Sequence, residues 1–303
     1  MVIRQRLKDH RMEQAVQFFC NEKRLFGILH LPKGTATENV VLMITGGPQT
    51  RYGSHRVFVQ LARYLCQKDI TVFRFDYEGL GDSDGNFVGS IHAGPSIHAA
   101  MEYLDKKIGN NHRRFIWSLC DGSSVSLMNI SYYDKRLAGL ILCNPLIHSE
   151  VALYRKHYYK ERIFEKELWM RLLTFRINFR EVVAELADYF QAAIKSAVRK
   201  DSKAETVSSS FTMTEQILKG IFSSRIPITF ILSTDDVVAQ EFREILFLGN
   251  NKKKLLRDKN IKVLSVEGAD HTFTQHQTKI KMFELTYRAA LDMWCLLLGL
   301  MIV

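Results

Sequence analysis

Short apolar runs alternate with amphipathic stretches along most of the chain, and this alternation limits the fold more than any other feature. The later runs are nearly continuous in apolar residues, which is typical of strands buried on both faces of a parallel sheet. We expect strands at 16–20, 25–31, 40–45, 70–75, 113–118, 137–143, 228–233 and 261–266, and helices at 54–68, 94–108, 121–132 and 278–298. The predicted class is α/β, with a mostly parallel sheet, helices on both faces, and the first two strands as an antiparallel hairpin at its edge.

One segment breaks the alternation. Residues 146–224 contain no convincing strand and much of the stretch is helix-like. An insertion there would lie over the carboxyl ends of the strands, where open α/β sheets bind ligands. We therefore predict a helical cap at 146–224, between two parts of one core at 1–145 and 225–303. A pair of crossover helices is the alternative, but the segment is long for such a connection.

The most informative short segment is 118–122, which reads Ser-Leu-Cys-Asp-Gly between an expected strand and an expected helix. This pattern, small-x-nucleophile-x-small, is that of a nucleophile elbow. The flanking residues must be small so that strand and helix can approach, and the helix N-terminus favours a reactive thiolate. The pattern predicts Cys120 as the nucleophile.

Other residues of this segment fit the pattern less well. With Asp121 as the nucleophile, one small position would fall on Leu119, and Ser118 or Ser123 would also break the register of small residues. The alternative for Cys120 itself is a small buried side chain without a chemical role.

Two backbone donors are expected beside the nucleophile. In this type of site one N–H comes from the loop after the third strand and the other from the residue after the nucleophile. The third strand runs into Gly46-Gly47-Pro48, and proline has no N–H. We predict an oxyanion hole formed by the backbone N–H groups of Gly47 and Asp121.

An acid and a base are expected further along the chain, in that order. Asp235 and Asp236 follow the strand expected at 228–233, and His271 follows the strand at 261–266. Histidine would accept the thiol proton or form an ion pair with the thiolate, and aspartate would orient the imidazole and stabilise its charged form. We predict Asp236 and His271, because Asp236 lies further beyond its strand; Asp235 and Asp270 are the alternatives.

A glycine-rich turn at 73–85 carries three aspartates. Asp76, Asp82 and Asp84 lie in and after this turn. Carboxylates in turns usually bond to local backbone, so we expect structural roles for all three.

The composition and the cysteine spacing restrict the class of protein and its compartment. The 303 residues are 47% hydrophobic and 24% charged, as in a globular protein with a large core. The five cysteines show no paired spacing, so we expect neither disulfides nor a bound metal, and we predict no cofactor. The first residues are charged and lack the apolar stretch of a signal peptide, which favours the cytoplasm.

The net charge of +10 favours an anionic partner, although a solvated face is the alternative for the basic stretches 155–180 and 252–254. Nucleic acid has only this charge in its favour and is not predicted. The apolar segment 293–303 is shorter than the roughly 20 residues of a membrane span. We expect it to complete a helix on the sheet, with peripheral contact to a membrane as the alternative. The oligomeric state is not predicted.

Aromatic and basic side chains are interleaved at 154–180 of the predicted cap. If the cap covers Cys120, arginines would bind an anionic group and aromatic faces would hold an apolar or sugar part. We predict that Arg155, His157 and Tyr158 bind the substrate, a small-molecule or lipid-linked acyl compound.

Taken together, the segments GGPQTRYGSHRVFVQLAR, FDYEGLGDSDG, WSLCDGSS, STDDVVAQEF and EGADHTF resemble the first family of exosortase A system-associated hydrolases. The resemblance covers nearly the whole chain and implies an α/β-hydrolase fold in a bacterium that makes exopolysaccharide. It places Cys120, Asp236 and His271 at matching positions. Ser118 departs from the more usual glycine, but it is still small. The resemblance does not imply a particular substrate.

Three functions follow from these residues. The first is hydrolysis of an ester, thioester or lactone through an S-acyl enzyme. The second is acyl transfer through the same intermediate, favoured if a closed cap excludes water. The third is a non-catalytic binding protein on the same fold.

Overall fold

The computed structural model describes residues 13–33, 38–130, 137–147, 204–247, 249–257 and 260–297. The chain divides into two compact units, one formed by 1–147 and 216–303 and the other by 148–215. The first unit holds the whole sheet. The predicted boundaries of the core and the cap stay a prediction, because most of 146–224 lies outside the described residues.

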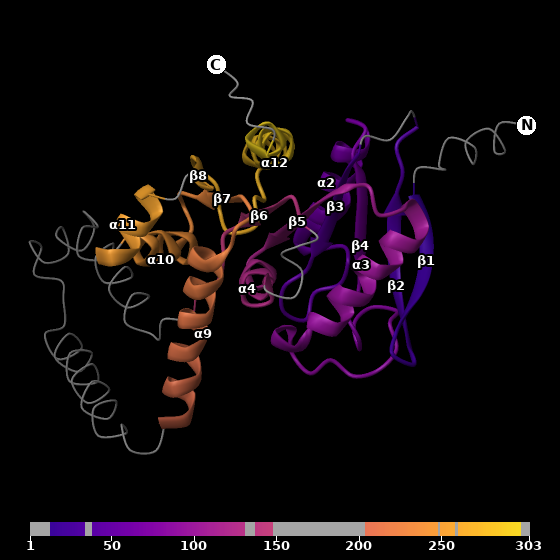
Figure 1. Cartoon of the computed structure of the whole chain (residues 1–303), viewed down its shortest axis with the longest axis horizontal. Helices are drawn as coiled ribbons and strands as arrows, with labels where there is room; N and C mark the ends of the chain where they lie inside the picture. Colours follow the sequence, from indigo (N-terminus) through magenta and orange to yellow (C-terminus); the bar gives the residue numbers. More distant parts are fainter. Residues whose placement is uncertain are drawn as a thin grey trace, which may run out of the picture. The chain divides into compact units, whose positions relative to one another are not determined.

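The core is an eight-stranded sheet (Figure 1) with the strand order β1-β2-β4-β3-β5-β6-β7-β8. β1 and β2 pair as an antiparallel hairpin, β2 pairs antiparallel with β4, and every later pairing is parallel. The strands are β1 Glu13–Cys20, β2 Lys23–His30, β3 Asn39–Ile44, β4 Thr71–Phe75, β5 Arg113–Leu119, β6 Gly139–Cys143, β7 Ile228–Ser233 and β8 Ile261–Val266. The eight predicted strands and the edge hairpin are confirmed.

One face of the sheet packs against α2 (Val57–Cys66) and α12 (His276–Leu297). Alternate residues of β5, Phe115 and Trp117, are fully buried in a cluster with both helices. The Trp117 ring meets Phe58 of α2 edge-on at 4.9 Å between centroids. This burial of aromatic and aliphatic side chains fixes the end of β5, from which the candidate nucleophile follows.

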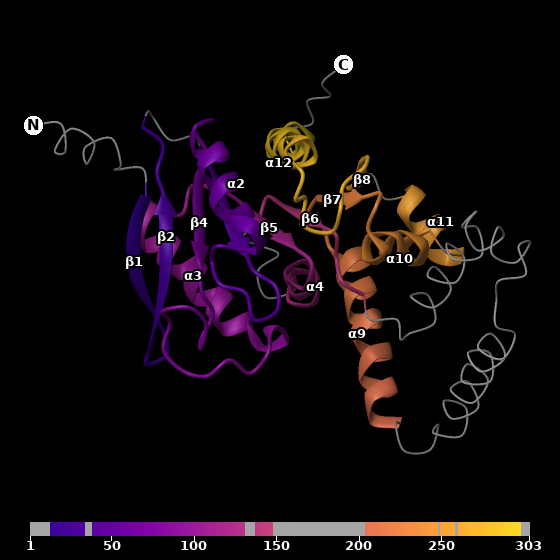
Figure 2. The ribbon, with the colours of Figure 1, turned by 180° about the vertical axis from the view of Figure 1, so that it is seen from behind.

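The opposite face packs against α3 (Gly94–Ile108), α4 (Asp121–Met128) and α10 (Val237–Leu246). Tyr103 of α3 contacts Phe73 of β4, and Phe242 of α10 contacts Phe230 of β7. Turned by 180° (Figure 2), the ribbon again shows α12 and α4 on opposite sides of the strands. The sheet is therefore covered on both faces, as predicted.

The remaining elements follow β6 and β7. The helix α9 (Ala204–Ser223) ends shortly before β7, and α11 (Gly249–Arg257) follows α10. The sequence did not lead us to predict α10 or α11. Two short 3-10 turns, Ser54–Arg56 and Ser90–His92, precede α2 and α3.

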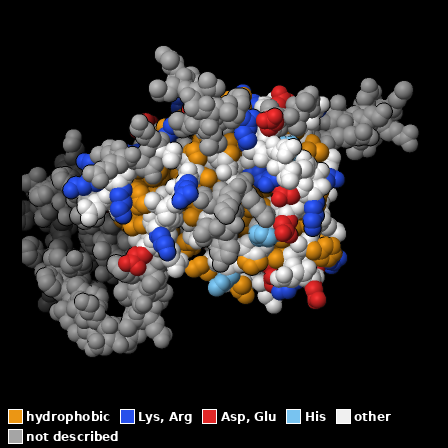
Figure 3. Space-filling view, in the orientation of Figure 1, with side chains coloured by type: hydrophobic (Ala, Val, Ile, Leu, Met, Phe, Trp, Pro, Cys, Tyr) orange, Lys and Arg blue, Asp and Glu red, His pale blue; other side chains and the backbone are white. Residues whose placement is uncertain are grey.

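On the face that Figure 3 shows, the basic side chains are spread out rather than gathered in one patch. The run Lys252–Lys254 on α11 is exposed, and the Lys254 ammonium lies 5.3 Å from the centre of the Phe222 ring. These three lysines are therefore exposed to solvent.

Candidate active site

The turn between β5 and α4 holds Cys120 in a backbone conformation that L-residues seldom adopt, with φ 60° and ψ −129°. Such a conformation persists only where the surroundings impose it. The Cys120 N–H donates to the carbonyl oxygen of Cys143 at 3.0 Å. A Cβ placed on Gly122 would lie 2.6 Å from the carbonyl oxygen of Ile44, so a larger residue would push α4 away from β3. This is the geometry of a nucleophile elbow.

The serines beside Cys120 are buried and engaged in hydrogen bonds. Ser123 Oγ donates to the Cys143 carbonyl at 3.0 Å, and Ser118 Oγ lies within hydrogen-bond distance of Ser123 and Ser126. Both Ser118 and Ser123 have no exposed surface, whereas Cys120 is partly exposed. Only Cys120 therefore combines the apex of the turn with access from solvent.

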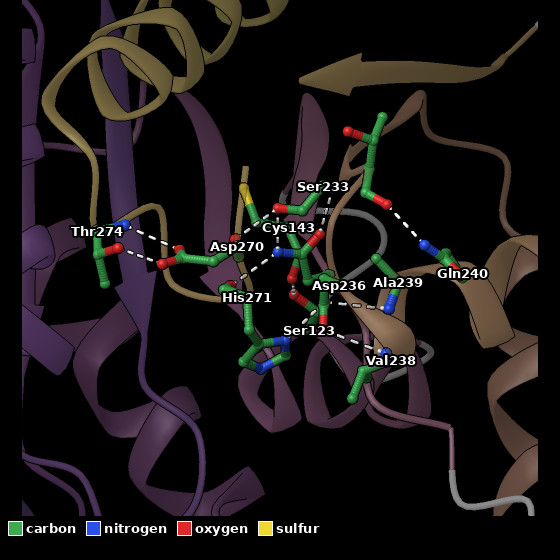
Figure 4. A network of polar contacts seen from close by, with 12 residues as sticks. Ser123, Cys143, Ser233, Asp236, Val238, Ala239, Gln240, Asp270, His271 and Thr274 are labelled. Atoms are coloured by element: carbon green, nitrogen blue, oxygen red, sulfur yellow. Dashed lines mark hydrogen bonds and ion pairs between the residues drawn. The ribbon is translucent and has the colours of Figure 1, made fainter. Parts of the chain in front are cut away.

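A histidine and an aspartate meet beside this turn (Figure 4). Oδ2 of Asp236 lies 2.7 Å from Nδ1 of His271. Asp236 is also the N-cap of α10, and its carboxylate accepts the backbone N–H groups of Val238 at 3.2 Å and Ala239 at 3.1 Å. Three donors thus hold one buried carboxylate in place.

The alternative acids point elsewhere. Asp235 is exposed and accepts a hydrogen bond from Thr234 Oγ1 at 3.0 Å. Asp270 turns toward Thr274 (Figure 4), accepting its N–H at 2.9 Å and its hydroxyl. Of the three aspartates that the sequence brought into question, the structure places Asp236 against His271.

The His271 imidazole is charged over an unusually wide pH range. Burial alone would lower its pKa, but hydrogen bonds with Asp236 and with the Cys120 side chain, and the negative charges of both groups, raise the pKa to about 10. An imidazolium between a carboxylate and a sulfur is the arrangement of an ion pair that activates a cysteine.

Two further residues hold the histidine loop, and sequence reasoning missed both. Asn144, just past β6, donates from Nδ2 to the His271 carbonyl and to Ser233 Oγ, each at 2.8 Å. Ser233, the last residue of β7, donates from Oγ to the Asp270 carbonyl at 2.8 Å and from its N–H to Asn144 Oδ1 at 2.8 Å. The only signal in the sequence is that Ser233 ends one expected strand and Asn144 directly follows another, at the edge of the sheet where the site lies.

The two predicted oxyanion donors lie in neighbouring segments, but one of them, the Gly47 N–H, is already hydrogen-bonded. A Cβ on Gly46 would lie 2.5 Å from the Gly122 nitrogen and 3.1 Å from that of Asp121, so the loop after β3 packs directly on the elbow. The Gly47 N–H, expected to be open, donates to Oδ2 of Asp121 at 2.9 Å. The expectation considered only the backbone of Asp121, whereas its short side chain, on the first residue of α4, folds back onto the neighbouring loop.

The acids of the glycine-rich turn have structural partners, as predicted. Asp76 is fully buried and accepts the backbone N–H of Arg51 at 2.5 Å as well as its guanidinium. The same guanidinium lies 2.5 Å from Asp82, and Asp84 pairs with Arg24 at 2.9 Å. The contacts of Asp76 and Asp82 tie the turn after β4 to the loop after β3, and that of Asp84 ties it to β2.

Other predictions lie outside the described residues or concern ligands. Arg155, His157 and Tyr158 fall in the part of the chain that the structure does not describe. Within the described ranges, no group of three His, Cys, Asp or Glu side chains could hold a metal ion. No helix among the described elements is long and apolar enough to cross a membrane.

The sheet order, the elbow and the Asp236–His271 pair define the class of protein: an enzyme with the α/β-hydrolase fold. The family model described as serine aminopeptidase, S33, matches residues 40–275. The chain belongs to this family, and is therefore a hydrolase. No match was found among curated proteins.

Solved structures share the fold at low sequence identity. An α/β serine hydrolase homologue from Coxiella burnetii is 14% identical, with a TM-score of 0.55 over 91% of this chain and 96% of that one. An esterase from Pyrococcus furiosus is 14% identical, with a TM-score of 0.61 over 93% and 91%. The Est1E protein from Butyrivibrio proteoclasticus, solved with ferulic acid, is 14% identical, with a TM-score of 0.57 over 91% and 96%. The names of the family and of the Coxiella protein refer to serine, whereas this chain has Cys120 at the elbow.

Proposed function

We propose that the protein is a cysteine hydrolase that cleaves an ester, thioester or lactone through an S-acyl enzyme. One observation carries the proposal: Cys120 lies at the strained apex of the elbow, and His271, whose pKa is raised by Asp236 and Cys120, bonds to Asp236. This is the order nucleophile, base and orienting acid that acyl transfer requires.

The chemistry proceeds in two halves. The Cys120 sulfur attacks the acyl carbon, and the leaving group departs with a proton from the His271 imidazolium, which leaves a thioester on Cys120. His271 then takes a proton from a water molecule, whose oxygen attacks the thioester carbon. The Cys120 thiolate leaves, the acid product is released, and the imidazolium is restored. Asp236 keeps the imidazole oriented and stabilises its charged form throughout.

Activity measurements on variants test this function. We expect Cys120→Ala to lower kcat/KM for p-nitrophenyl esters and matching thioesters by about 10³-fold or more, as when a triad nucleophile is removed. Cys20→Ala, at a buried position on β1, is the matched control and should change kcat/KM by less than about 3-fold, as expected for a change outside the acyl site. Hydrolysis that survives in Cys120→Ala would assign the reaction to another group.

Acyl transfer is the second candidate, because a thioester intermediate reacts readily with amines as well as with water. Adding a soluble amine or alcohol acceptor and separating the products distinguishes the two outcomes. Free acid alone supports hydrolysis, whereas an acceptor-linked acyl product supports transfer.

The substrate class rests on the sequence. We infer an acyl compound on an anionic carrier, bound by Arg155, His157 and Tyr158, and a role beside exosortase and exopolysaccharide systems. The interleaved arginines and aromatic residues and the resemblance of the motifs support this inference. A cytoplasmic site of action, with peripheral contact to the inner membrane, belongs to the same proposal. Arg155→Ala should raise KM for a phosphorylated acyl ester and leave KM for a neutral ester unchanged; an equal effect on both would contradict it.

A further inference from the structure

The side chain of Asp121, the residue after the nucleophile, binds the Gly47 N–H, which is one of the two predicted oxyanion donors. Oδ2 of Asp121 accepts the Gly47 N–H at 2.9 Å. The same oxygen accepts the hydroxyl of Ser90, which is a buried residue of the 3-10 turn Ser90–His92. The carboxylate is therefore held from two sides, by the loop after β3 and by the turn before α3.

The two contacts have a direct chemical consequence. An oxyanion hole works because its N–H groups point, unoccupied, at the place where negative charge develops on the substrate oxygen. Here the Gly47 N–H already donates to the carboxylate of Asp121. A substrate carbonyl oxygen must displace that anion or develop its charge next to it, and both are unfavourable.

The local packing leaves room for such a displacement. A Cβ added to Gly46 would collide with the Gly122 nitrogen at 2.5 Å, so this part of the loop is held against α4. A Cβ added to Gly47 would meet no heavy atom within 4 Å, and its φ of +52° suits glycine. The Cα of Gly47 thus borders open space, and no neighbouring heavy atom crowds this side of the residue when the carboxylate turns away.

We propose that Asp121 is a specificity-determining residue of the acyl site. Its carboxylate, held by Ser90, competes with the substrate oxygen for the Gly47 N–H. Small neutral acyl groups are therefore poor substrates, and good substrates displace the carboxylate with binding energy from contacts remote from the acyl carbon. This inference rests on the proposed function, because it assumes that the acyl carbon reacts with Cys120.

Removal of the carboxylate tests the inference with p-nitrophenyl acetate, which offers few remote contacts. Removal of one oxyanion donor lowers kcat by about 10²–10³-fold. Freeing the Gly47 N–H can therefore raise kcat by no more than this factor. We expect Asp121→Ala to raise kcat/KM for this ester about 10-fold, and Ser90→Ala to raise it less. Because Ser90 acts through Asp121, the double variant should not exceed Asp121→Ala. Asp84→Ala, which removes a surface carboxylate paired with Arg24, is the control and should change nothing.

A second measurement separates this inference from the proposed function. Alkylation by iodoacetamide requires the Cys120 sulfur but no oxyanion hole, so its rate in Asp121→Ala should stay within about 3-fold of the wild-type rate. An unchanged alkylation rate with an unchanged or lower kcat/KM would overturn the role of Asp121. If Cys120 is not alkylated in the wild-type protein, the proposed function itself fails.

A conservative variant covers the case in which Asp121→Ala does not fold. Asp121→Asn keeps the size of the side chain, and its neutral amide oxygen is a weaker acceptor for the Gly47 N–H. It should raise kcat/KM in the same direction by a smaller factor. A folded Asp121→Asn protein with lower kcat/KM for p-nitrophenyl acetate would also overturn the inference.

Discussion

Oδ2 of Asp236 lies 2.7 Å from Nδ1 of His271, whereas the neighbouring Asp235 is exposed and pairs with Thr234. The two aspartates are adjacent in sequence, yet only the first of these contacts can orient the imidazole. This difference makes them a matched pair for substitution.

Asp236→Asn should lower kcat by up to about 10⁴-fold, because an amide cannot stabilise the imidazolium and would favour the wrong tautomer. Asp235→Asn should leave kcat within about 3-fold of wild type, since loss of an exposed pair removes little. Steady-state kinetics on one ester measures both. The reverse ranking would transfer the orienting role to Asp235.

The cysteines should differ sharply in reactivity. Cys120 is partly exposed beside an imidazolium, whereas Cys20, Cys66 and Cys143 are buried. Burial raises the pKa of the Cys66 thiol to about 11 and also raises those of Cys20 and Cys143. We expect iodoacetamide to label Cys120 at least about 100-fold faster than these three at pH 7, because only a thiolate reacts. Peptide mass mapping over time measures the rates, and similar labelling of all four would contradict the assignment.

Asn144 should position His271 from 127 positions away in sequence. Asn144→Gly keeps the positive φ of this position but leaves the Ser233 N–H and the His271 carbonyl without their amide partner. We expect kcat to fall about 10-fold with KM little changed, and the free energy of unfolding to fall by about 1–3 kcal/mol. Kinetics and urea unfolding measure the two effects.

Asn129→Gly serves as the control for this variant, because the Asn129 amide bonds to the Val125 carbonyl of its own helix. It should lower stability without lowering kcat. If both variants lower kcat in proportion to lost stability, Asn144 has only a structural role.

The raised pKa of His271 predicts a specific pH dependence. A histidine whose pKa is raised by folding stabilises the protein fully below its unfolded value of about 6.5, and this stabilisation is lost as pH rises through the folded value. For His271 the folded pKa is about 10. The difference in unfolding free energy between wild type and His271→Asn should therefore be larger at pH 6 than at pH 10. Urea unfolding at the two pH values measures it, and NMR should show no titration of His271 between pH 6 and 8.

The sequence predicted the sheet well because buried parallel strands are nearly continuous in apolar residues, as in Ile228–Ser233. It predicted the elbow because small residues at 118 and 122 are a local requirement. The helices α10 and α11 were missed, although Asp236 is a typical N-cap and could have indicated the start of α10. Two hydrogen bonds could not be predicted: the one from Asn144 to the His271 carbonyl and the one from the Gly47 N–H to the Asp121 carboxylate. Both depend on how strands and loops that are distant in sequence meet, which no local pattern encodes.

Direct detection of the acyl enzyme tests the central claim. Brief reaction with p-nitrophenyl acetate, acid quenching and intact mass measurement should show one added acetyl group, which fragmentation places on Cys120 and hydroxylamine removes, as expected of a thioester. The adduct should accumulate further in Asp236→Asn, where the base that activates water is misoriented. An acetyl group on a serine instead of Cys120, or turnover without any adduct in either protein, would contradict a cysteine nucleophile.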